Sequence, residues 1–441
     1  MEKNKKESNI NLMLIGLIIV LLISSITIWG YILLRNQLES NPQVNPKTQT
    51  IIREKDNQEQ EKEGVDMDAD LGEFELSFLK LENKGKNNIY SPLSIKYALY
   101  LLRDGANGET LTQIENIIGK ETDVKKYENI EDKLSFANSV YIKESFQERV
   151  KKAYIENVKN RYNAEINYDK FESAKNVNDW IDRKTFGQIK NVLNDNQVTN
   201  ADVILINALA IDMKWKNQFA PENTQGKAFF LSDGSKMQAT TLYQETRSDD
   251  VSYYKDDDVT ALCMDLEDIG DNKLSFMAVM PNEENLSEYV KDFKLEDLEK
   301  IESNLKLTSE EENKVQIYIP KFEYDYELNF KDDLIALGLG DIFKANVPDF
   351  TNITDDSMWV TDAIHKANIE FKEEGTKAAA VTVFTMKANG MAVEKDYKPI
   401  VVDINKPFLY FIKDKESGEI WFVGTLYEPS DWQEDKADYN K

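Results

Sequence analysis

Cysteine and histidine are almost absent from this chain of 441 residues, and each scarcity excludes a class of chemistry. The single cysteine, Cys263, cannot form an intramolecular disulfide, and its apolar neighbours indicate a buried thiol rather than a nucleophile. The single histidine, His365, excludes a metal site that needs two imidazoles. The glycine-rich nucleotide-binding motifs and the GxSxG motif of hydrolases are missing as well. We therefore expect no metal, no cofactor and no conventional enzyme active site.

Basic residues are also in the minority, with 54 lysines and arginines against 80 acidic residues and a formal net charge of −26. Binding to phosphates needs a basic face, so this balance argues against nucleic acid as a partner. The acidity favours a solvated, self-repelling surface that keeps a protein soluble. We expect a monomer.

Charge is missing altogether from residues 10–34, which follow an N-terminal segment, residues 1–9, that contains three lysines. At about 1.5 Å per residue, this stretch is long enough to cross a hydrocarbon core of about 30 Å. The lysines favour a cytoplasmic N-terminus with the bulk of the chain outside the cell. A cleaved signal peptide is the alternative, but the apolar run is long for one and no A-x-A site follows it. The sequence predicts a single-pass transmembrane anchor in the cell membrane.

The rest of the chain divides by composition. Residues 35–70 are polar and charged, with two prolines and few large apolar residues, and predict a flexible acidic stalk. Apolar periodicity begins at Leu71 and continues to Pro429, which predicts one domain over residues 71–429. Helical patterns come early and strand patterns late, which is typical of an α+β fold. The acidic residues 430–441 are expected to form a loose tail.

Several segments of this domain carry clear local signals. Ser91 followed by Pro92 is an N-cap with proline at the first helical position. The nearly continuous apolar run of residues 203–211 predicts a central strand buried on both faces. Residues 407–412 and 420–426 predict two strands joined by a turn at residues 416–419.

The most unusual stretch, residues 371–407, combines strand periodicity with turn residues at both ends of its first half. From 376 to 386 the even positions are small or apolar and uncharged, whereas the odd positions include Lys377. One face could therefore be buried in a sheet while the other stays solvated. Residues 373–375 (Glu-Glu-Gly) and 388–390 (Ala-Asn-Gly) favour turns, so the segment is predicted to be a loop with the pattern of a strand. An edge strand or an alanine-rich helix is the alternative.

Six motifs, in this order, resemble those of the serpin family. They are Asn87…Ser91-Pro92-Leu93-Ser94, Asn207…Trp215…Phe219…Thr224…Phe229, Ile319-Pro320-Lys321-Phe322, Ala363-Ile364-His365-Lys366-Ala367, Glu373-Glu374-Gly375-Thr376 and Asn405-Lys406-Pro407-Phe408. The resemblance covers residues 71–429 and depends on the ordered combination. It implies a serpin fold of three β-sheets with eight or nine helices and an exposed reactive loop, here preceded by the predicted transmembrane helix. The richness in lysine, asparagine and isoleucine suggests a bacterial surface protein.

The resemblance also implies a function, namely inhibition of an endopeptidase rather than enzymatic turnover. In inhibitory serpins a protease cleaves the reactive loop and forms an acyl-enzyme, and the freed segment then inserts into the large sheet and traps the protease. By this similarity residues 375–388 would insert. The hinge and the inserting segment would contain Glu373, Glu374, Gly375, Thr376, Ala378, Ala379, Ala380 and Thr382. No proline interrupts the chain from Gly375 to Ala392, as pairing in a sheet requires. Lys377 departs from the glutamate common in inhibitory members, on the face predicted to be solvated.

The cleaved bond is predicted from the family's usual spacing. Counting from Glu373 gives Asn389–Gly390, although Asn-Gly could merely turn the loop. Cleavage after Lys387, Ala388, Met386 or Met391 stays open as an alternative. We expect a subtilisin-like or elastase-like serine protease as the target. A cysteine protease is compatible too, because trapping needs only a covalent intermediate.

A second group of residues resembles the hydrogen-bonded cluster that controls opening of the sheet in serpins. These sheet-opening residues are Ser91, Ser94, Asn207, Trp215 and His365. Titration of the histidine could make opening pH-sensitive. Two alternatives to inhibition remain at this point: a non-inhibitory serpin that serves as a surface binding module, and a membrane-anchored enzyme that uses His365 with a serine or with Cys263.

Overall fold

The computed structural model describes residues 71–120, 124–375 and 399–433. The predicted anchor and stalk, the reactive bond and the inserting residues from Thr376 onward lie outside the described residues. Within the described ranges, no helix has the length and apolar character needed to span a membrane.

Nine α-helices occur in the described ranges, in keeping with the eight or nine that were expected. They are α3 (Leu71–Leu81), α4 (Pro92–Gly105), α5 (Gly108–Ile118), α6 (Lys152–Tyr162), α7 (Lys175–Lys184), α8 (Asp195–Thr199), α9 (Leu286–Asp292), α10 (Leu295–Ser303) and α11 (Lys331–Ala336).

Sixteen strands accompany these helices in the described part of the chain. They are β1 (Asn88–Tyr90), β2 (Leu134–Lys143), β3 (Glu165–Asp169), β4 (Val203–Ile211), β5 (Gln225–Phe230), β6 (Lys236–Thr246), β7 (Val251–Lys255), β8 (Val259–Asp265), β9 (Leu274–Pro281), β10 (Lys306–Leu307), β11 (Val315–Pro320), β12 (Phe322–Asn329), β13 (Ile364–Phe371), β14 (Val401–Asp403), β15 (Phe408–Asp414) and β16 (Ile420–Leu426).

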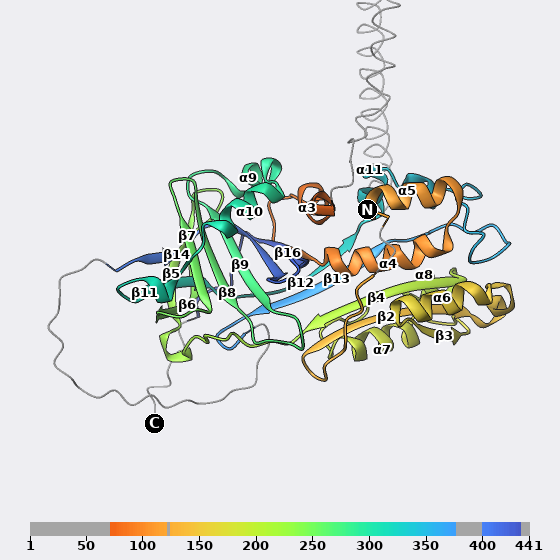
Figure 1. The fold of residues 1–441 in the computed structure, drawn as a ribbon, viewed down its shortest axis with the longest axis horizontal. Helices are drawn as coiled ribbons and strands as arrows, with labels where there is room; N and C mark the ends of the chain where they lie inside the picture. Colours follow the sequence, from red (N-terminus) through yellow and green to blue (C-terminus); the bar gives the residue numbers. More distant parts are fainter. Residues whose placement is uncertain (1–70, 121–123, 376–398, 434–441) are drawn as a thin grey trace, which may run out of the picture. The chain divides into compact units, whose positions relative to one another are not determined.

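The strands form four sheets rather than the three that the resemblance implied. Their orders are β1-β16-β15-β9-β8-β7-β10, β14-β11-β6-β5, β3-β2-β4 and β12-β13. The extra sheet arises because β4 and β13 lie side by side but share no ladder of hydrogen bonds in the described residues. Figure 1 shows α4 on one side of these two strands and α7 on the other. The two small sheets are therefore halves of one layer, separated by a gap between β4 and β13.

Local signals in the sequence account for several elements. The Ser91 side chain caps α4 by accepting a hydrogen bond from the Ser94 amide at 3.0 Å, and Pro92 is the first helical residue, which confirms the predicted helix start. The hairpin predicted near the C-terminus is confirmed as the antiparallel pair β15 and β16. Both strands are buried along almost their whole length, which explains their continuous apolar sequences.

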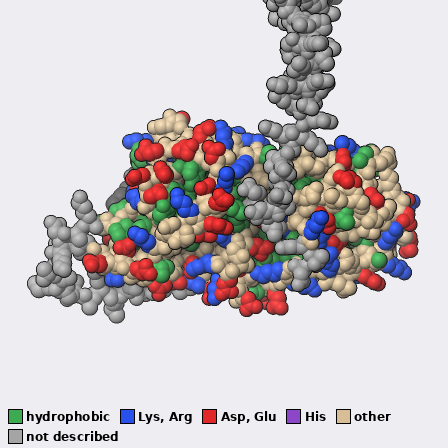
Figure 2. Space-filling model, turned by 45° about the horizontal axis from the view of Figure 1, so that its top comes forward, with side chains coloured by type: hydrophobic (Ala, Val, Ile, Leu, Met, Phe, Trp, Pro, Cys, Tyr) green, Lys and Arg blue, Asp and Glu red, His purple; other side chains and the backbone are tan. Residues whose placement is uncertain are grey.

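Two expectations were wrong in part. The first residues of β4, Val203 to Leu205, are only half-buried, because this end of the strand lines a cavity instead of packing on both faces. The chain from Ser430 to Trp432 is not a loose tail, because it continues beside β6, where the backbone of Ser430 and Trp432 bonds to Thr240 and Gln238. The charged side chains lie as the composition suggested, with acidic and basic groups interspersed over the face seen in Figure 2.

Candidate functional site

The gap between β4 and β13 is closed at one end by the predicted hinge. After Phe371 the chain turns through residues 372–375 and meets the segment that follows β4. The amides of Trp215 and Phe219 donate to the carbonyls of Glu374 and Glu373 at 3.0 and 2.9 Å. The Trp215 indole Nε1 donates to the Lys372 carbonyl at 2.9 Å. Backbone hydrogen bonds therefore tie the hinge to the end of the strand across the gap.

Gly375 is the residue at which the two sides come closest. It forms an antiparallel bridge with Lys214, and it also exchanges two backbone hydrogen bonds with Lys372. A Cβ atom at this position would lie 2.1 Å from the Met213 carbonyl oxygen, a distance that no side chain can tolerate. Glycine is therefore required here by the close approach of two backbones.

The carboxylate of Glu373 fixes the hinge from a third direction. Its Oε2 accepts a hydrogen bond from Lys321 Nζ, and its Oε1 accepts one from Thr224 Oγ1, both at 2.9 Å. Burial disfavours the charged form of this side chain, which is only 13% exposed. The hydrogen bonds from Lys321 and Thr224 outweigh that effect, so the pKa of Glu373 lies below its ordinary value. The ionised carboxylate is thus the stable form in the closed hinge.

Aromatic rings fill the space behind the hinge. The ring centroids of Trp215 and Phe371 are 5.0 Å apart, and Phe371 stacks on Phe322 at 4.9 Å. Phe276 contacts both Trp215 and Phe371. All four side chains are essentially inaccessible to solvent. This end of the gap is as densely packed as an ordinary core.

The opposite end of the gap is spanned by a chain of polar side chains under the strands. His365 on β13 accepts a hydrogen bond at Nε2 from the Ser91 amide at 3.0 Å. The next link runs through the start of α4, where the Ser94 amide bonds to Ser91 Oγ. Ser94 Oγ then donates to Asn207 Oδ1 on β4 at 2.5 Å. The chain of bonds thus connects the two strands that flank the gap through the first turn of α4.

The polar chain continues beyond β4. Asn207 Nδ2 donates to Asn138 Oδ1 on β2 at 2.9 Å, and Asn138 Nδ2 donates to the carbonyl of Tyr162 at the end of α6, also at 2.9 Å. Asn138 is buried, so its amide would be costly to leave without partners. The extended chain of bonds therefore couples β13 to β4, to β2 and to the end of α6.

The environment of His365 suits a structural role. Burial lowers the pKa of His365 to about 4, so the ring is neutral at neutral pH. Because Nε2 accepts a hydrogen bond, the proton of the neutral ring lies on Nδ1. Burial also raises the pKa of Cys263 to about 11, which leaves the thiol unreactive. Neither side chain has the surroundings of a catalytic base or nucleophile.

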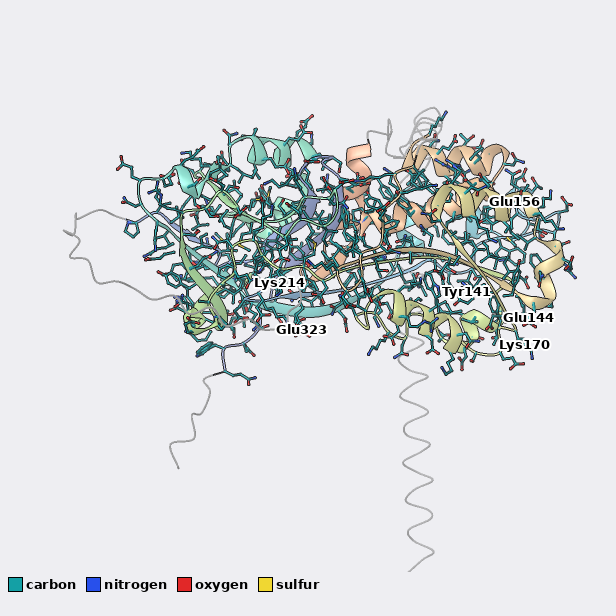
Figure 3. The ribbon with its side chains drawn as sticks, turned by 60° about the horizontal axis from the view of Figure 1, so that its bottom comes forward. Tyr141, Glu144, Glu156, Lys170, Lys214 and Glu323 are labelled. Carbon is teal, nitrogen blue, oxygen red and sulfur yellow. The ribbon has the colours of Figure 1, made fainter. Side chains whose placement is uncertain are left out.

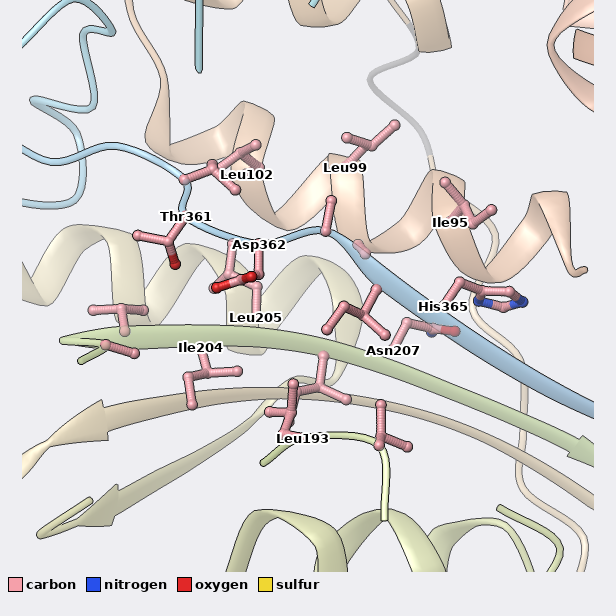
Figure 4. A pocket seen from close by; sticks show the side chains of 18 of the residues that line it. Ile95, Leu99, Leu102, Leu193, Ile204, Leu205, Asn207, Thr361, Asp362 and His365 are labelled. Carbon is pink, nitrogen blue, oxygen red and sulfur yellow. The ribbon is translucent and has the colours of Figure 1, made fainter. Parts of the chain in front are cut away.

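A cavity of about 400 Å³ lies between the two strands and α4, next to the polar chain. Figure 4 shows Ile204 and Leu205 of β4 on one side of it and Leu99 and Leu102 of α4 on another, with His365 at one end. A second cavity of only about 20 Å³ lies farther along, where Leu209–Ile211 face Ala367–Glu370. The gap therefore narrows toward the hinge. In Figure 3, Lys214 marks the hinge end and Tyr141, which pairs with Ile204, marks the cavity end.

The structure groups the sequence-predicted residues into two places. Ser91, Ser94, Asn207 and His365 lie together at the cavity end, whereas Trp215 lies with Glu373, Glu374 and Gly375 at the hinge. Sequence reasoning did not identify Asn138 as part of the polar chain. It also did not identify Lys321 and Thr224 as partners of Glu373, although both occur in the motifs that carry the resemblance. Within the described ranges, no cluster of three or more metal-ligating side chains could hold a metal ion.

Comparison with known proteins gives one consistent result. The family model described as serpin (serine protease inhibitor) matches residues 74–429. An uncharacterized serpin-like protein of Methanosarcina acetivorans is 29% identical over 363 residues, which cover 78% of this chain and 82% of the relative. Human neuroserpin is 28% identical over 391 residues, covering 82% and 90%. The crystal structure of the thermophilic serpin tengpin in its native state is similar with a TM-score of 0.66 at 26% identity, covering 80% of this chain and 92% of tengpin.

Proposed function

This chain belongs to the serpin family, whose general activity is protease inhibition, and we propose that it traps a serine protease as a suicide substrate. In the proposed reaction the serine hydroxyl of the target attacks the carbonyl carbon of Asn389, and the amine of Gly390 leaves. Residues 375–388 then insert between β4 and β13 while Asn389 is still esterified to the protease. The translocated protease is distorted before water can release it.

The observation that carries this proposal is the gap itself. β4 and β13 both run from the cavity end toward the hinge, so their facing edges are parallel. A segment that turns back at Gly375 would run antiparallel to both strands, the direction that allows direct ladder pairing on each side. The gap is flanked by two strand edges whose backbone groups an additional strand could pair with, and it contains a largely apolar cavity that the strand could fill.

The register of the hinge extends naturally into the gap. The pairs Lys372–Gly375 and Lys214–Gly375 set an antiparallel register on each side. Continued without a bulge, this register pairs Thr382 with His365 on one strand and with Asn207 on the other. The hydroxyl of Thr382 would thus enter the polar chain, and the other even-numbered residues would face the apolar core. The uncharged even positions in the sequence suit that environment.

The same register offers a role for Lys377. It pairs residue 377 with Glu370 of β13 and with Asp212, which follows β4. Both neighbours are acidic, so a lysine between them would be favourable where a glutamate would be repelled. The departure from the glutamate common in inhibitory serpins is therefore compatible with insertion.

Insertion would be driven by burial and by pairing. Filling an apolar cavity gains about 0.8 kcal/mol for each buried methylene group, and two strand edges acquire hydrogen-bond partners. The uncut state retains the cavity and the separated strands, so it is the less stable arrangement of the same residues. This difference in free energy is the source of work on the trapped protease.

The small residues around Asn389–Gly390 favour a subtilisin-like or elastase-like target. Cleavage after Met386, Lys387, Ala388 or Met391 would shift the specificity toward other proteases, cysteine proteases included. The uncharged segment of residues 10–34 supports a tethered inhibitor whose serpin domain lies outside the cell.

The decisive experiment is denaturing electrophoresis of the full chain after incubation with a subtilisin, an elastase, a trypsin and a papain-like protease. We expect a band at the summed mass that survives boiling, and mass spectrometry of the released peptide then identifies the cleaved bond. Clean cleavage by all four proteases without an adduct would count against trapping within this panel.

Thermal unfolding of the cut chain then separates the alternatives. A large gain in stability would mean insertion without the right target, and no gain would favour a surface binding module.

A further inference from the structure

The segment that follows the family match lies directly beside the hinge. The Ser430 carbonyl accepts from the Thr240 amide and the Ser430 amide donates to the Lys321 carbonyl, both at 2.9 Å. Two residues farther along, the Trp432 amide donates to the Gln238 carbonyl at 2.8 Å. Thr240 Oγ1 adds a hydrogen bond to the Asp431 carbonyl at 2.9 Å. Residues 430–432 are therefore paired with β6 over three successive positions.

This segment bonds directly to one partner of the Glu373 carboxylate and lies against a neighbour of the other. Ser430 holds the backbone of Lys321, whose ammonium group binds one oxygen of Glu373. Trp432 lies against Gly226 so closely that a Cβ atom there would be 2.6 Å from its indole ring. Gly226 stands at the start of β5, two residues after Thr224, which binds the other carboxylate oxygen.

We propose that residues 430–432 form a brace that positions Lys321 and Thr224, and so sets how readily the hinge opens. The proposal deepens the function proposed above, since hinge opening is the first movement of insertion. The brace follows directly after the matched family region, which ends at residue 429. The brace stabilises the uncut state, because the bonds of Glu373 that it supports belong to the closed hinge.

The test measures hydrogen exchange at the hinge in the full chain without any protease. The reporters are the amides of Trp215 and Phe219, which donate to the hinge carbonyls. Two substitutions disturb the brace from opposite sides: Trp432→Ala removes the ring, and Gly226→Ala introduces a Cβ that the ring cannot tolerate. We expect each to raise exchange at both reporters by roughly fivefold to tenfold. Tyr168→Ala, which removes an exposed aromatic side chain on β3, is the matched control and is expected to change neither.

The double variant Gly226→Ala with Trp432→Ala provides the sharper result. If the glycine matters only because the ring covers it, the double variant exchanges no faster than Trp432→Ala alone. Additive effects, unchanged reporters, or an equal rise at the buried amides of β15 and β16 would overturn the brace, the last because it would indicate global destabilisation. These outcomes do not depend on inhibition. A brace detected in a chain that traps no protease would refute the proposed function alone, and trapping with silent reporters would refute the brace alone.

Discussion

The two ends of the gap between β4 and β13 differ in how they are held. At the hinge, four buried aromatic rings, three hydrogen bonds to hinge carbonyls and the Glu373–Lys321 ion pair close the space completely. At the other end the same two strands flank a cavity of about 400 Å³ and are connected through hydrogen bonds of Ser91, Ser94, Asn207 and His365. The space between β4 and β13 is therefore densely packed at the hinge and loosely packed at the cavity end.

This contrast indicates which end of the gap could accommodate an inserting strand. Apolar packing resists change because side chains that interdigitate cannot be exchanged one by one. Hydrogen bonds are directional and can be replaced by others of similar strength when a new group arrives. In the proposed insertion, a strand entering from the hinge would meet a largely apolar and spacious site that is held by replaceable hydrogen bonds. The gain in stability would then come from filling the cavity end, and the packing at the hinge would oppose the start of insertion.

The largest effect is expected from a charge placed on the face that enters the cavity. Thr382→Arg would bring a guanidinium group between Asn207 and His365, where the hydrogen-bond partners of both side chains are uncharged. We expect the covalent adduct to fall by roughly 100-fold relative to cleaved chain. Lys377→Arg is the matched control, because it carries an arginine on the opposite face between Glu370 and Asp212. Equal trapping by both variants would show that the proposed register is wrong.

A substitution at the hinge is expected to lower the stability of the uncleaved chain. Gly375→Ala forces a Cβ to within 2.1 Å of the Met213 carbonyl oxygen, so the hinge backbone must move. We expect a loss of about 2–4 kcal/mol in the free energy of unfolding, measured with denaturant. Gly234→Ala serves as the control, since Gly234 has a positive φ of 82° but no atom near a Cβ, and should lose only about 1 kcal/mol. Similar losses in the two variants would mean that the hinge yields easily.

The sequence predicted the elements that depend on local signals better than the contacts between distant residues. Ser91 and Pro92 predicted the start of α4 through local capping chemistry, and two apolar runs predicted the strands found as β15 and β16. Such signals are local, so they can be recognised from neighbouring residues. The hinge partners Lys321 and Thr224 lie 52 and 149 residues from Glu373, and only the fold brings them together.

Two departures show why sequence periodicity was insufficient. The apolar run of β4 indicated burial on both faces, yet one end of the strand lines a cavity, because periodicity reports hydrophobicity and not whether a partner is present. The acidic composition after residue 429 indicated a loose tail, but backbone hydrogen bonds and the contact of Trp432 with Gly226 hold Ser430 to Trp432 against β6. These tertiary contacts outweighed the average character of the segment.

A smaller effect is expected from interrupting the hydrogen bonds of the polar chain at the cavity end. Asn207→Ala removes the acceptor of Ser94 Oγ and the donor to Asn138 Oδ1. We expect the uncut chain to lose about 1–3 kcal/mol of unfolding free energy. Asn304→Ala is the comparison, because Asn304 is exposed, lies outside the cavity and donates to Lys300 and Ser303 in the preceding helical turn. If both substitutions cost the same, the polar chain would not be what holds the cavity end.

The smallest effect expected at ordinary pH comes from His365 and can be isolated because the chain has a single histidine. Burial lowers the pKa of the ring from an ordinary 6.5 to about 4. The unfolded chain therefore takes up a proton before the folded one does. The stability contributed by the neutral ring is complete above pH 6.5 and is lost as the pH falls toward 4. Between pH 8 and pH 5 the loss should be about 2 kcal/mol.

His365→Gln keeps an acceptor for the Ser91 amide but cannot titrate, so the difference between the two proteins reports the ring alone. This difference is needed because burial raises the pKa of Asp333 to about 6, and that carboxyl group gains stability over the same fall in pH. The contribution of Asp333 is present in both proteins and cancels. Urea unfolding of both at pH 8, 6.5 and 5 gives the measurement, and parallel pH profiles would remove His365 as a switch. If the profiles diverge while the rate of protease trapping stays constant from pH 5.5 to 8, the histidine stabilises the cavity end but does not control the opening of the hinge.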